Sequence, residues 1–303
     1  MTIYNEIKYY SGTQPVVLSI GNFDGLHLGH QYLLQKNIDF AAKLGARAAL
    51  LSFDPHPLKV IRPEELRYPL SLLEEQEIGL ENMGMDEWIR EPFTQKMREE
   101  KAQEFIERLV RYLPLKAVVV GADFRFGKNR EGDITRLQSL ASQFNFQVLT
   151  PETFLYQGQR VSSSLIRRFL LSGEIPQANA FLGRPYSVSG KVISGFRRGR
   201  TIGFPTANIK TVLAHNLQRG VYNTRAYIRG TRWKAATNIG LHPTFEESNE
   251  LQVEVHLLDF SENIYGEELK IEFINFLRPE IKFKDVDSLK TQITKDVLLV
   301  RES

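Results

Sequence analysis

Residues 21–30, GNFDGLHLGH, combine two histidines with three glycines where an anion could bind. The apolar run before them, residues 15–20, predicts a buried strand, and the residues after them have helical spacing. In an open α/β sheet, ligands bind at this edge, where the first N–H groups of the next helix also face an anion. His27 and His30 would share a face of a helix that begins near Leu28, so we expect both to donate to phosphate oxygens.

Glycines in this segment let the backbone approach a ligand closely. A single histidine near a helix start is more often a cap or a core residue, but the pair, the glycines and the preceding strand together favour a binding site. The Walker phosphate loop and the Rossmann glycine fingerprint are both absent. The candidate residues for phosphate contact are Gly21, Asn22, Phe23, Asp24 and Gly29.

Serines at positions 162 to 164 are typical of a helix N-cap. Arg167 would lie about one turn inside that helix and could reach back toward an anion at its start. Capping alone is the alternative interpretation of Ser162 and Ser163.

Two loops after predicted strands carry candidates for binding a flat ring. Residues 52–57 contain two prolines that make the loop stiff. Residues 121–133 interleave aromatic and basic side chains, which could stack on a ring and meet phosphate, although the same composition is typical of a mobile surface loop. The candidates are Pro55, Pro57, Asp123, Phe124 and Phe126.

A second dense motif spans residues 190–208, GKVISGFRRGRTIGFPTAN. Its glycines and arginines predict a flexible basic flap over phosphates, although such a tract alone is also typical of RNA contacts. Thr206 and Asn208 are two residues apart, so on an extended segment their oxygens could hold Mg²⁺ with ATP. The phosphate-binding candidates are Gly190, Lys191, Arg198, Gly203, Thr206 and Asn208.

Glu254 lies in the run LQVEVHLL, whose alternation places Gln252, Glu254 and His256 on one face of a strand. A carboxylate there can accept the proton of a primary alcohol as that alcohol attacks the γ-phosphate of ATP. A solvent-facing strand glutamate is the alternative interpretation.

The elements that must position these residues fall into two groups. Alternating strands and helices up to about residue 182 predict an α/β domain with a doubly wound, mostly parallel sheet. Short strands separated by Gly and Pro beyond residue 185 predict an antiparallel β-barrel, with the domain boundary between residues 183 and 184. The expected strands are 16–20, 46–53, 117–121 and 146–149, then 186–193, 220–228, 233–239, 251–258 and 269–276; the expected helices are 30–44, 72–83, 101–113, 134–144 and a closing helix over 285–300 with Val286, Leu289, Ile293 and Val297 or Leu298 on its apolar side.

The composition excludes several classes of protein. The 303 residues carry a net charge of +3 and no cysteine, which excludes disulfides and thiolate metal sites. No apolar run approaches the ~18 residues of a membrane span, and no signal peptide is evident, so we expect a cytoplasmic protein with no membrane partner. Residues 175–245 contain eleven Lys and Arg and no Asp or Glu, which predicts a positive potential that attracts polyphosphate or nucleic acid.

The motifs resemble those of one enzyme family. GNFDGLHLGH matches the HxGH signature of the nucleotidyltransferase superfamily, in a form that resembles the bacterial bifunctional riboflavin kinase/FAD synthetase. VSSSLIR, residues 161–167, resembles the ISSTxIR motif of the same superfamily, and RRGRTIGFPTAN resembles the flavokinase motif. The resemblance extends from Val17 to about Phe283; family members commonly have Arg where this chain has His242.

This resemblance implies an FMN adenylyltransferase domain over residues 1–183 and a riboflavin kinase domain over residues 184–303. His27, His30 and Arg167 would stabilise the ATP phosphates during adenylyl transfer to FMN. Glu254 would be the base at the riboflavin 5′-hydroxyl, with Thr206 and Asn208 at Mg-ATP. The implied partners are riboflavin, FMN and ATP with Mg²⁺, and no nucleic acid is expected.

Two alternatives remain open at this point. One is a nucleic-acid-binding protein with a basic C-terminal barrel and a nucleotide-sensing N-terminal domain, which would lose affinity steeply with salt. The other keeps the enzyme class but makes only one half active. The sequence predicts no oligomeric state.

Overall fold

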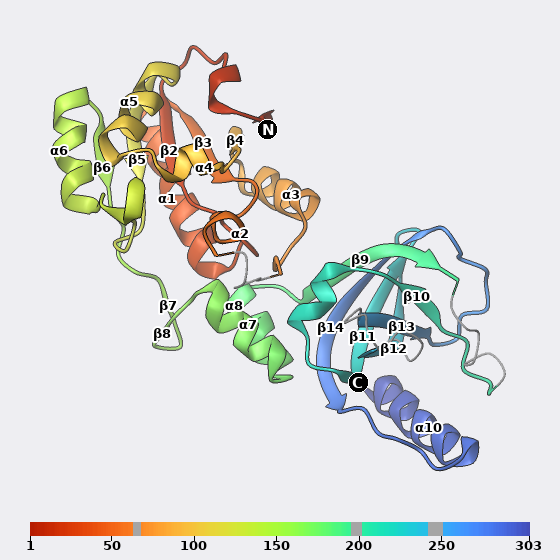
Figure 1. Ribbon diagram of the computed structural model, residues 1–303. Helices are drawn as coiled ribbons and strands as arrows, with labels where there is room; N and C mark the ends of the chain where they lie inside the picture. The colour runs from red at the N-terminus through yellow and green to blue at the C-terminus, as the bar shows by residue number, and fades with distance from the viewer. Residues whose placement is uncertain (63–67, 195–201, 242–250) are drawn as a thin grey trace. The chain divides into compact units, whose positions relative to one another are not determined.

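The computed structural model describes residues 1–62, 68–194, 202–241 and 251–303. The chain forms two compact units: residues 1–67 with 72–161, and residues 68–71 with 162–303 (Figure 1). The second unit begins before residue 184 because α7 (Ser163–Leu171) and α8 (Ile175–Leu182) bury their apolar sides in it. Helix α8 packs on strands β9 (Tyr186–Ile193) and β14 (Glu268–Arg278). The functional boundary between residues 183 and 184 stays a prediction.

The first unit is a six-stranded parallel sheet in the order β1-β4-β3-β2-β5-β6, so the predicted α/β class is confirmed. Its strands are β1 (Thr2–Tyr4), β2 (Val16–Ile20), β3 (Arg47–Phe53), β4 (Glu87–Glu91), β5 (Leu115–Val119) and β6 (Gln147–Leu149). Its helices are η1 (Ile7–Tyr9), α1 (Leu28–Leu44), α2 (Pro57–Ile61), α3 (Leu73–Met83), α4 (Gln95–Arg98), α5 (Ala102–Tyr112), η2 (Lys128–Arg130) and α6 (Ile134–Phe144). A small hairpin, β7 (Leu155–Tyr156) and β8 (Gln159–Arg160), precedes α7.

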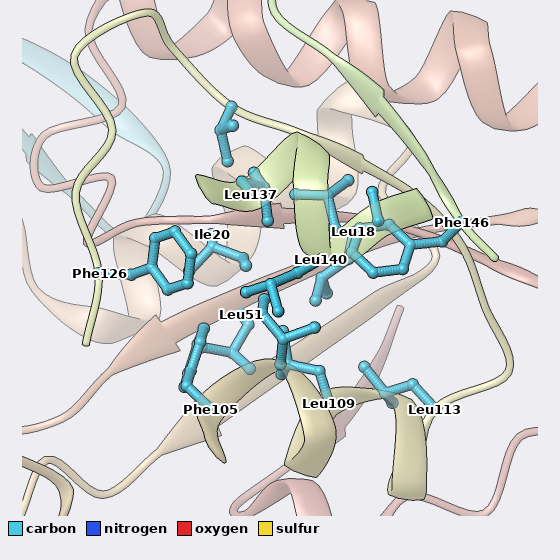
Figure 2. Packing of buried hydrophobic residues seen from close by; sticks show 14 of the residues in the cluster. Leu18, Ile20, Leu51, Phe105, Leu109, Leu113, Phe126, Leu137, Leu140 and Phe146 are labelled. Carbon is cyan, nitrogen blue, oxygen red and sulfur yellow. The ribbon is translucent and has the colours of Figure 1, made fainter. Parts of the chain in front are cut away.

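Successive side chains of β2 point to opposite faces of this sheet, so the strand contributes apolar residues to both of its cores. Leu18 and Ile20 belong to one hydrophobic core, which α5 and α6 cover, as Figure 2 shows. Val17 belongs to the other core, which α1 and α3 line. Each fully buried Leu or Val contributes about 1.5–3 kcal/mol, so continuous apolar strands such as β2 are stable only between two helical layers.

Strand β4 was not predicted because two of its five residues are glutamates. Both are buried and paired: Glu87 accepts from the Tyr10 hydroxyl at 2.9 Å, and Glu91 forms an ion pair with Arg108 at 2.7 Å. Pairing with residues far apart in the chain lets charged side chains lie inside a parallel sheet.

The second unit is a closed antiparallel barrel in the order β10-β13-β12-β11-β14-β9, as predicted. Its strands are β9 (Tyr186–Ile193), β10 (Ala207–Ile209), β11 (Gly220–Ile228), β12 (Thr231–Leu241), β13 (Leu251–Leu257) and β14 (Glu268–Arg278), with η3 (Val212–Asn216) between β10 and β11 and α10 (Val286–Glu302) at the end. Strand β10 was missed because three residues are too short for a periodic signal. No helix in the described ranges combines the length and hydrophobicity needed to cross a bilayer.

The predicted helix at the C-terminus is confirmed, and Leu289, Ile293 and Val297 of its predicted apolar side are partly buried, but Val286 and the alternative Leu298 are not. Val286 and Leu298 are more than half exposed, whereas Asp296 and Val300 are buried. Asp296 lies inward because Arg278 of β14 binds it, with Nη2 2.7 Å from Oδ2. The ion pair thus lies on the same side of α10 as its partly buried apolar residues.

Replacing Asp296 with Ala should destabilise the second unit by up to about 3 kcal/mol, because Arg278, whose side chain is only 15 % exposed, would lose its counter-charge. The measurement is thermal unfolding of the full chain. Asp287→Ala, an exposed position on the same helix, is the matched control and should leave the melting temperature nearly unchanged. Equal shifts for the two variants would contradict the role of the ion pair.

Candidate functional site

Three predicted segments follow adjacent strands of the parallel sheet. Strand β2 lies between β3 and β5 in the sheet. The chain passes from β2 to β3 on one side and enters β5, on the other side, only later in the sequence. Residues 21–30, 54–57 and 121–126 follow the carboxyl ends of β2, β3 and β5. This is a topological switch point, where ligands bind in open α/β sheets.

The turn between β2 and α1 is tightly wound. Phe23 and Leu26 have φ values of +50° and +40°, and Gly25 has +82°, a left-handed region that non-glycine residues rarely adopt. A side chain at Gly21 would lie 3.0 Å from the Phe23 ring. Non-glycine residues in this conformation are concentrated at functional sites, where the surrounding structure maintains them.

The two histidines of this turn stack on each other, with ring centroids 3.5 Å apart and planes 17° apart. α1 begins at Leu28, as expected, but His27 is its N-cap: the His27 Nδ1 accepts from the backbone N–H of His30 at 3.2 Å. An accepting Nδ1 carries no proton, so the proton of the neutral ring is on Nε2, which can donate to a ligand. The expected shared helical face is therefore replaced by ring stacking.

Two polar atoms of this turn are buried without a hydrogen-bond partner among the described residues: Asn22 Oδ1 and His30 Nδ1. The Asn22 amide nitrogen lies 3.0 Å from His56 Nε2. An unsatisfied buried polar atom costs about 1–3 kcal/mol, which a polar ligand would relieve. The turn thus provides unpaired polar atoms beside a stacked imidazole pair.

The HxGH segment also contacts the beginning of the second motif. A Cβ at Gly29 would lie 3.4 Å from the His27 ring and 3.5 Å from Val161. Asp24 is buried, with 8 % of its surface exposed. Gly29 therefore allows residue 161, which precedes the predicted serines, to lie against the histidine turn.

Burial, and next the proximity of His27, lowers the pKa of His30 well below its ordinary value. In the unfolded chain this histidine binds a proton below about pH 6.5, so acid favours unfolding. The contribution of His30 to stability should be complete above that pH and should decline, as the pH falls, by up to about 1.4 kcal/mol per pH unit. Melting temperatures between about pH 8 and pH 5 should fall more for the wild type than for His30→Asn, which does not titrate there. Parallel curves would contradict this assignment.

The predicted flavin contacts divide into surface and core residues. Asp123 is exposed and forms an ion pair with Arg160 at 2.5 Å, and Phe124 is half-buried. Phe126 is 7 % exposed and packs against Phe105 in the core. Its role as a flavin contact stays a prediction. Pro55 lies in the loop after β3, and Pro57 is the first residue of α2, whose N-cap is His56.

On the barrel, the predicted alternation of β13 is confirmed. Val253 and Val255 are fully buried, whereas Gln252, Glu254 and His256 lie half-buried on the opposite face. Glu254 is in register with Asn208 on β10 and with Asn238 on β12. Directly paired residues place their Cβ atoms about 4.5–5.5 Å apart on the same face, so a carboxylate lies between two amides.

Side chains of β13 hold the segment that carries Thr206 and Asn208. Gln252 Nε2 donates to Asn208 Oδ1 at 2.6 Å, and His256 Nδ1 lies 2.8 Å from the Pro205 carbonyl oxygen. Thr206 precedes β10 directly and is half-buried, while Asn208 is 5 % exposed. Asn208 therefore lies opposite Glu254 on one barrel face, and Thr206 is two residues before it at the start of the same segment.

Other predicted phosphate contacts of the barrel are placed as follows. A Cβ at Gly190 would lie 3.1 Å from the Lys210 carbonyl oxygen, so this glycine permits close packing of β9 on β10. Lys191 is exposed on β9, and Gly203 has φ +91°. Arg198 and His242 lie outside the described residues. Within the described ranges, no group of three His, Cys, Asp or Glu residues could hold a metal ion.

The sequence analysis assigned no role to Asn238, which lies in the run ATNIG. Only the register of β12 with β13 places this amide opposite Glu254.

The serine group forms the predicted N-cap. Ser162 Oγ accepts from the Leu165 backbone N–H at 3.3 Å, and Ser163 is the first residue of α7. Arg167, one turn inside α7, donates from Nε and Nη2 to the Tyr68 carbonyl oxygen at 3.2 and 3.0 Å.

Some of the positive charge of residues 175–245, which contain no Asp or Glu, is neutralised by acidic residues from elsewhere in the chain. Arg229, in the turn between β11 and β12, forms ion pairs with Glu262 and Glu267. These glutamates follow β13 in the chain, outside residues 175–245. The predicted positive potential is therefore weaker at this end of the barrel than the sequence suggests.

Comparisons with known proteins identify a family for each part of the chain. A FAD synthetase family model matches residues 10–165, and a riboflavin kinase family model matches residues 182–303. Curated relatives named bifunctional riboflavin kinase/FMN adenylyltransferase are 39 % identical in Haemophilus influenzae, covering 94 % of this chain and 92 % of the relative, and 37 % identical in Listeria monocytogenes, covering 92 % and 90 %.

A solved structure described as a macrolide-efflux protein from Streptococcus pneumoniae has the same fold. It is 28 % identical, with a TM-score of 0.89 over 99 % of this chain and 98 % of that one. Its description differs from the names of the curated relatives, which are more similar in sequence and match the two family models. With both family models matched in order and such identity over nearly the full length, the chain belongs to the bifunctional riboflavin kinase/FMN adenylyltransferase family.

Proposed function

We propose that the chain converts riboflavin and ATP into FMN and ADP at the barrel, and FMN and ATP into FAD and pyrophosphate at the parallel sheet. The observation that best supports this is the stacked His27–His30 pair, with buried unpaired polar atoms beside it at a sheet switch point. A second and different phosphate-transfer arrangement, Glu254 in register with Asn208, lies on the barrel.

At the barrel, Glu254 acts as general base. The riboflavin 5′-oxygen attacks the γ-phosphorus, the bond from that phosphorus to the β–γ bridging oxygen breaks, and ADP leaves. The Glu254 carboxylate accepts the hydroxyl proton. Asn208 and Asn238 lie opposite Glu254 on the neighbouring strands, so both amides are placed to orient the carboxylate or the phosphates.

The residues near Glu254 suit Mg²⁺. Thr206 and Asn208 offer a hydroxyl and an amide oxygen, the hard donors that this ion prefers, and Gln252 holds the Asn208 amide. When bound, Mg²⁺ neutralises charge on the ATP phosphates. The remaining ligands would be phosphate oxygens and water.

At the parallel sheet, an FMN phosphate oxygen attacks the α-phosphorus of ATP, and pyrophosphate leaves as its bond to that phosphorus breaks. A phosphate monoester is already a competent nucleophile, so this site supplies alignment and charge stabilisation rather than a strong base. His27 donates from Nε2, and His30 and Arg167 complete the set of donors. Phe124, Asp123, Pro55 and Pro57 remain proposed flavin contacts, with Gly190, Lys191, Arg198 and Gly203 proposed for ATP at the barrel.

One assay tests the proposal: the purified chain is incubated with riboflavin, ATP and Mg²⁺, and the flavins are separated by chromatography. We expect FMN first and FAD later. Formation of neither would overturn the proposal, and FMN alone would restrict it to the kinase half. Oligonucleotide binding that falls steeply with salt, without flavin turnover, would favour the nucleic-acid-binding alternative.

A further inference from the structure

A histidine in the loop after β3 contacts an amide in the turn after β2. His56 is the N-cap of α2, and Asn22 follows β2 directly by one glycine. The Asn22 side-chain nitrogen lies 3.0 Å from His56 Nε2. The next residue, Phe23, packs on the His30 ring with centroids 5.1 Å apart. The contact therefore joins the loops of two adjacent strands at the carboxyl edge of the parallel sheet, in the turn that carries the stacked imidazole pair.

The two ring nitrogens of His56 have different roles. The backbone N–H of Leu58 donates to Nδ1 at 3.2 Å. A backbone N–H is only a donor, so Nδ1 must be the acceptor and carries no proton. A neutral imidazole then has its proton on Nε2. The nitrogen that faces Asn22 is therefore a hydrogen-bond donor.

This tautomer determines which atom of the Asn22 amide faces His56. An Nε2–H group cannot donate to an NH₂ group, so the amide is turned over about its Cβ–Cγ bond, and its oxygen accepts from Nε2. The hydrogen-bond partners are what distinguish the oxygen of an amide from its nitrogen. The NH₂ group then occupies the buried position for which the described residues offer no partner. A buried donor without an acceptor costs about 1–3 kcal/mol, so this position favours a ligand that accepts a hydrogen bond.

We propose that Asn22 donates its side-chain NH₂ group to a phosphate oxygen during adenylyl transfer, and that His56 is the positioning residue that holds the amide in the donating orientation. The proposal rests on the proposed function of the parallel sheet. Deprotonated phosphate oxygens accept hydrogen bonds and do not donate them, and this edge is where ligands bind in open α/β sheets. An amide that turned freely would also present its oxygen, which repels phosphate. The Nε2–H of His56 excludes that orientation.

The tautomer can be measured directly, without turnover. In the full chain labelled with ¹⁵N-histidine, the signals of His56 are assigned by their loss in His56→Asn. They should show an unprotonated Nδ1 and a protonated Nε2 at neutral pH. A ring protonated on Nδ1 would leave the amide nitrogen facing His56 and would overturn the inference.

Kinetics test the donor itself, with riboflavin phosphorylation and adenylylation of supplied FMN measured separately. Asn22→Asp keeps the shape of the side chain but replaces the NH₂ group with an oxygen. It should lower kcat/KM for ATP in adenylylation by about 10²- to 10³-fold, the usual loss for one stabilising donor, with KM for FMN and the kinase rate nearly unchanged. A loss confined to KM for FMN would place the donor at the flavin, and a wild-type rate would show that no donor is needed. Either result would overturn the assignment to phosphate.

Variants of His56 separate its two contacts. His56→Asn keeps an N-cap acceptor for Leu58 but is too short to reach Asn22, so adenylylation should fall by about 10- to 100-fold, the cost of a misplaced group. His56→Gln, whose NH₂ group can donate from near the place of Nε2, should restore most of the rate. Ile61→Ala, an exposed position on α2, is the matched control.

A double substitution separates positioning from general damage to the fold. In the Asn22→Leu background there is no amide to hold, so adding His56→Asn should change adenylylation by less than about twofold. Equal losses in both backgrounds, or loss of both activities, would contradict the positioning role. A wild-type chain that makes no FAD would overturn the proposed function, and the assignment to phosphate with it, whereas the tautomer of His56 would still be measured independently.

Discussion

Replacing Glu254 with Gln should lower the rate of riboflavin phosphorylation by about 10²- to 10⁴-fold, the usual contribution of a general base. Glutamine keeps the size and the hydrogen-bonding capacity of the side chain but cannot accept a proton from the 5′-hydroxyl. Because the register with Asn208 and Asn238 is set by the strands, the variant should still fold and bind ATP. The measurement is FMN formation, together with a direct titration of ATP binding.

Glu268→Gln is the matched control, since Glu268 is an exposed strand glutamate on β14. It should phosphorylate riboflavin at the wild-type rate. The Glu254→Gln variant should also adenylylate supplied FMN normally. A near wild-type kinase rate for Glu254→Gln would show that Glu254 is not the general base and is only a solvent-facing strand residue.

Replacing His30 with Ala should abolish FAD formation while FMN formation stays nearly intact. The substitution removes a neutral donor from the start of α1 and the ring that stacks on His27, so the remaining imidazole loses its support. Loss of one stabilising donor at a transition state costs about 10²- to 10³-fold, and loss of the stack adds to it. FAD formation from supplied FMN is the measurement, with riboflavin phosphorylation as the internal reference.

Tyr32→Ala controls for the removal of a ring from the same helix, because Tyr32 lies on α1 and packs on Phe154 with centroids 5.4 Å apart. This variant should keep both activities. If His30→Ala reduced FMN and FAD formation equally, the two-site interpretation would be wrong. If it left FAD formation unchanged, the stacked pair would be only a helix cap.

Much of the architecture follows from local pattern. The predicted ranges 16–20, 134–144, 186–193 and 220–228 agree with β2, α6, β9 and β11 to the residue, because apolar periodicity and Gly or Pro boundaries are encoded within each segment. Strand β4 escaped detection because its buried glutamates bind partners from elsewhere in the chain, a tyrosine hydroxyl and an arginine. The exposed Val286 shows the same limit for α10, where Arg278 draws Asp296 inward.

The sites divide in the same way. Residue type, spacing and alternation in the sequence were enough to indicate the histidine turn, the Thr206–Asn208 pair and the outward face of Glu254, since each depends on residues close in the chain. Only tertiary structure decided that His27 caps α1 and stacks on His30, that Phe126 belongs to the core, and that Asn238 lies opposite Glu254. It also decided that Arg167 is held by Tyr68, 99 positions away in the chain. Strand register and long-range pairing depend on the packing of the whole chain, which no local pattern records.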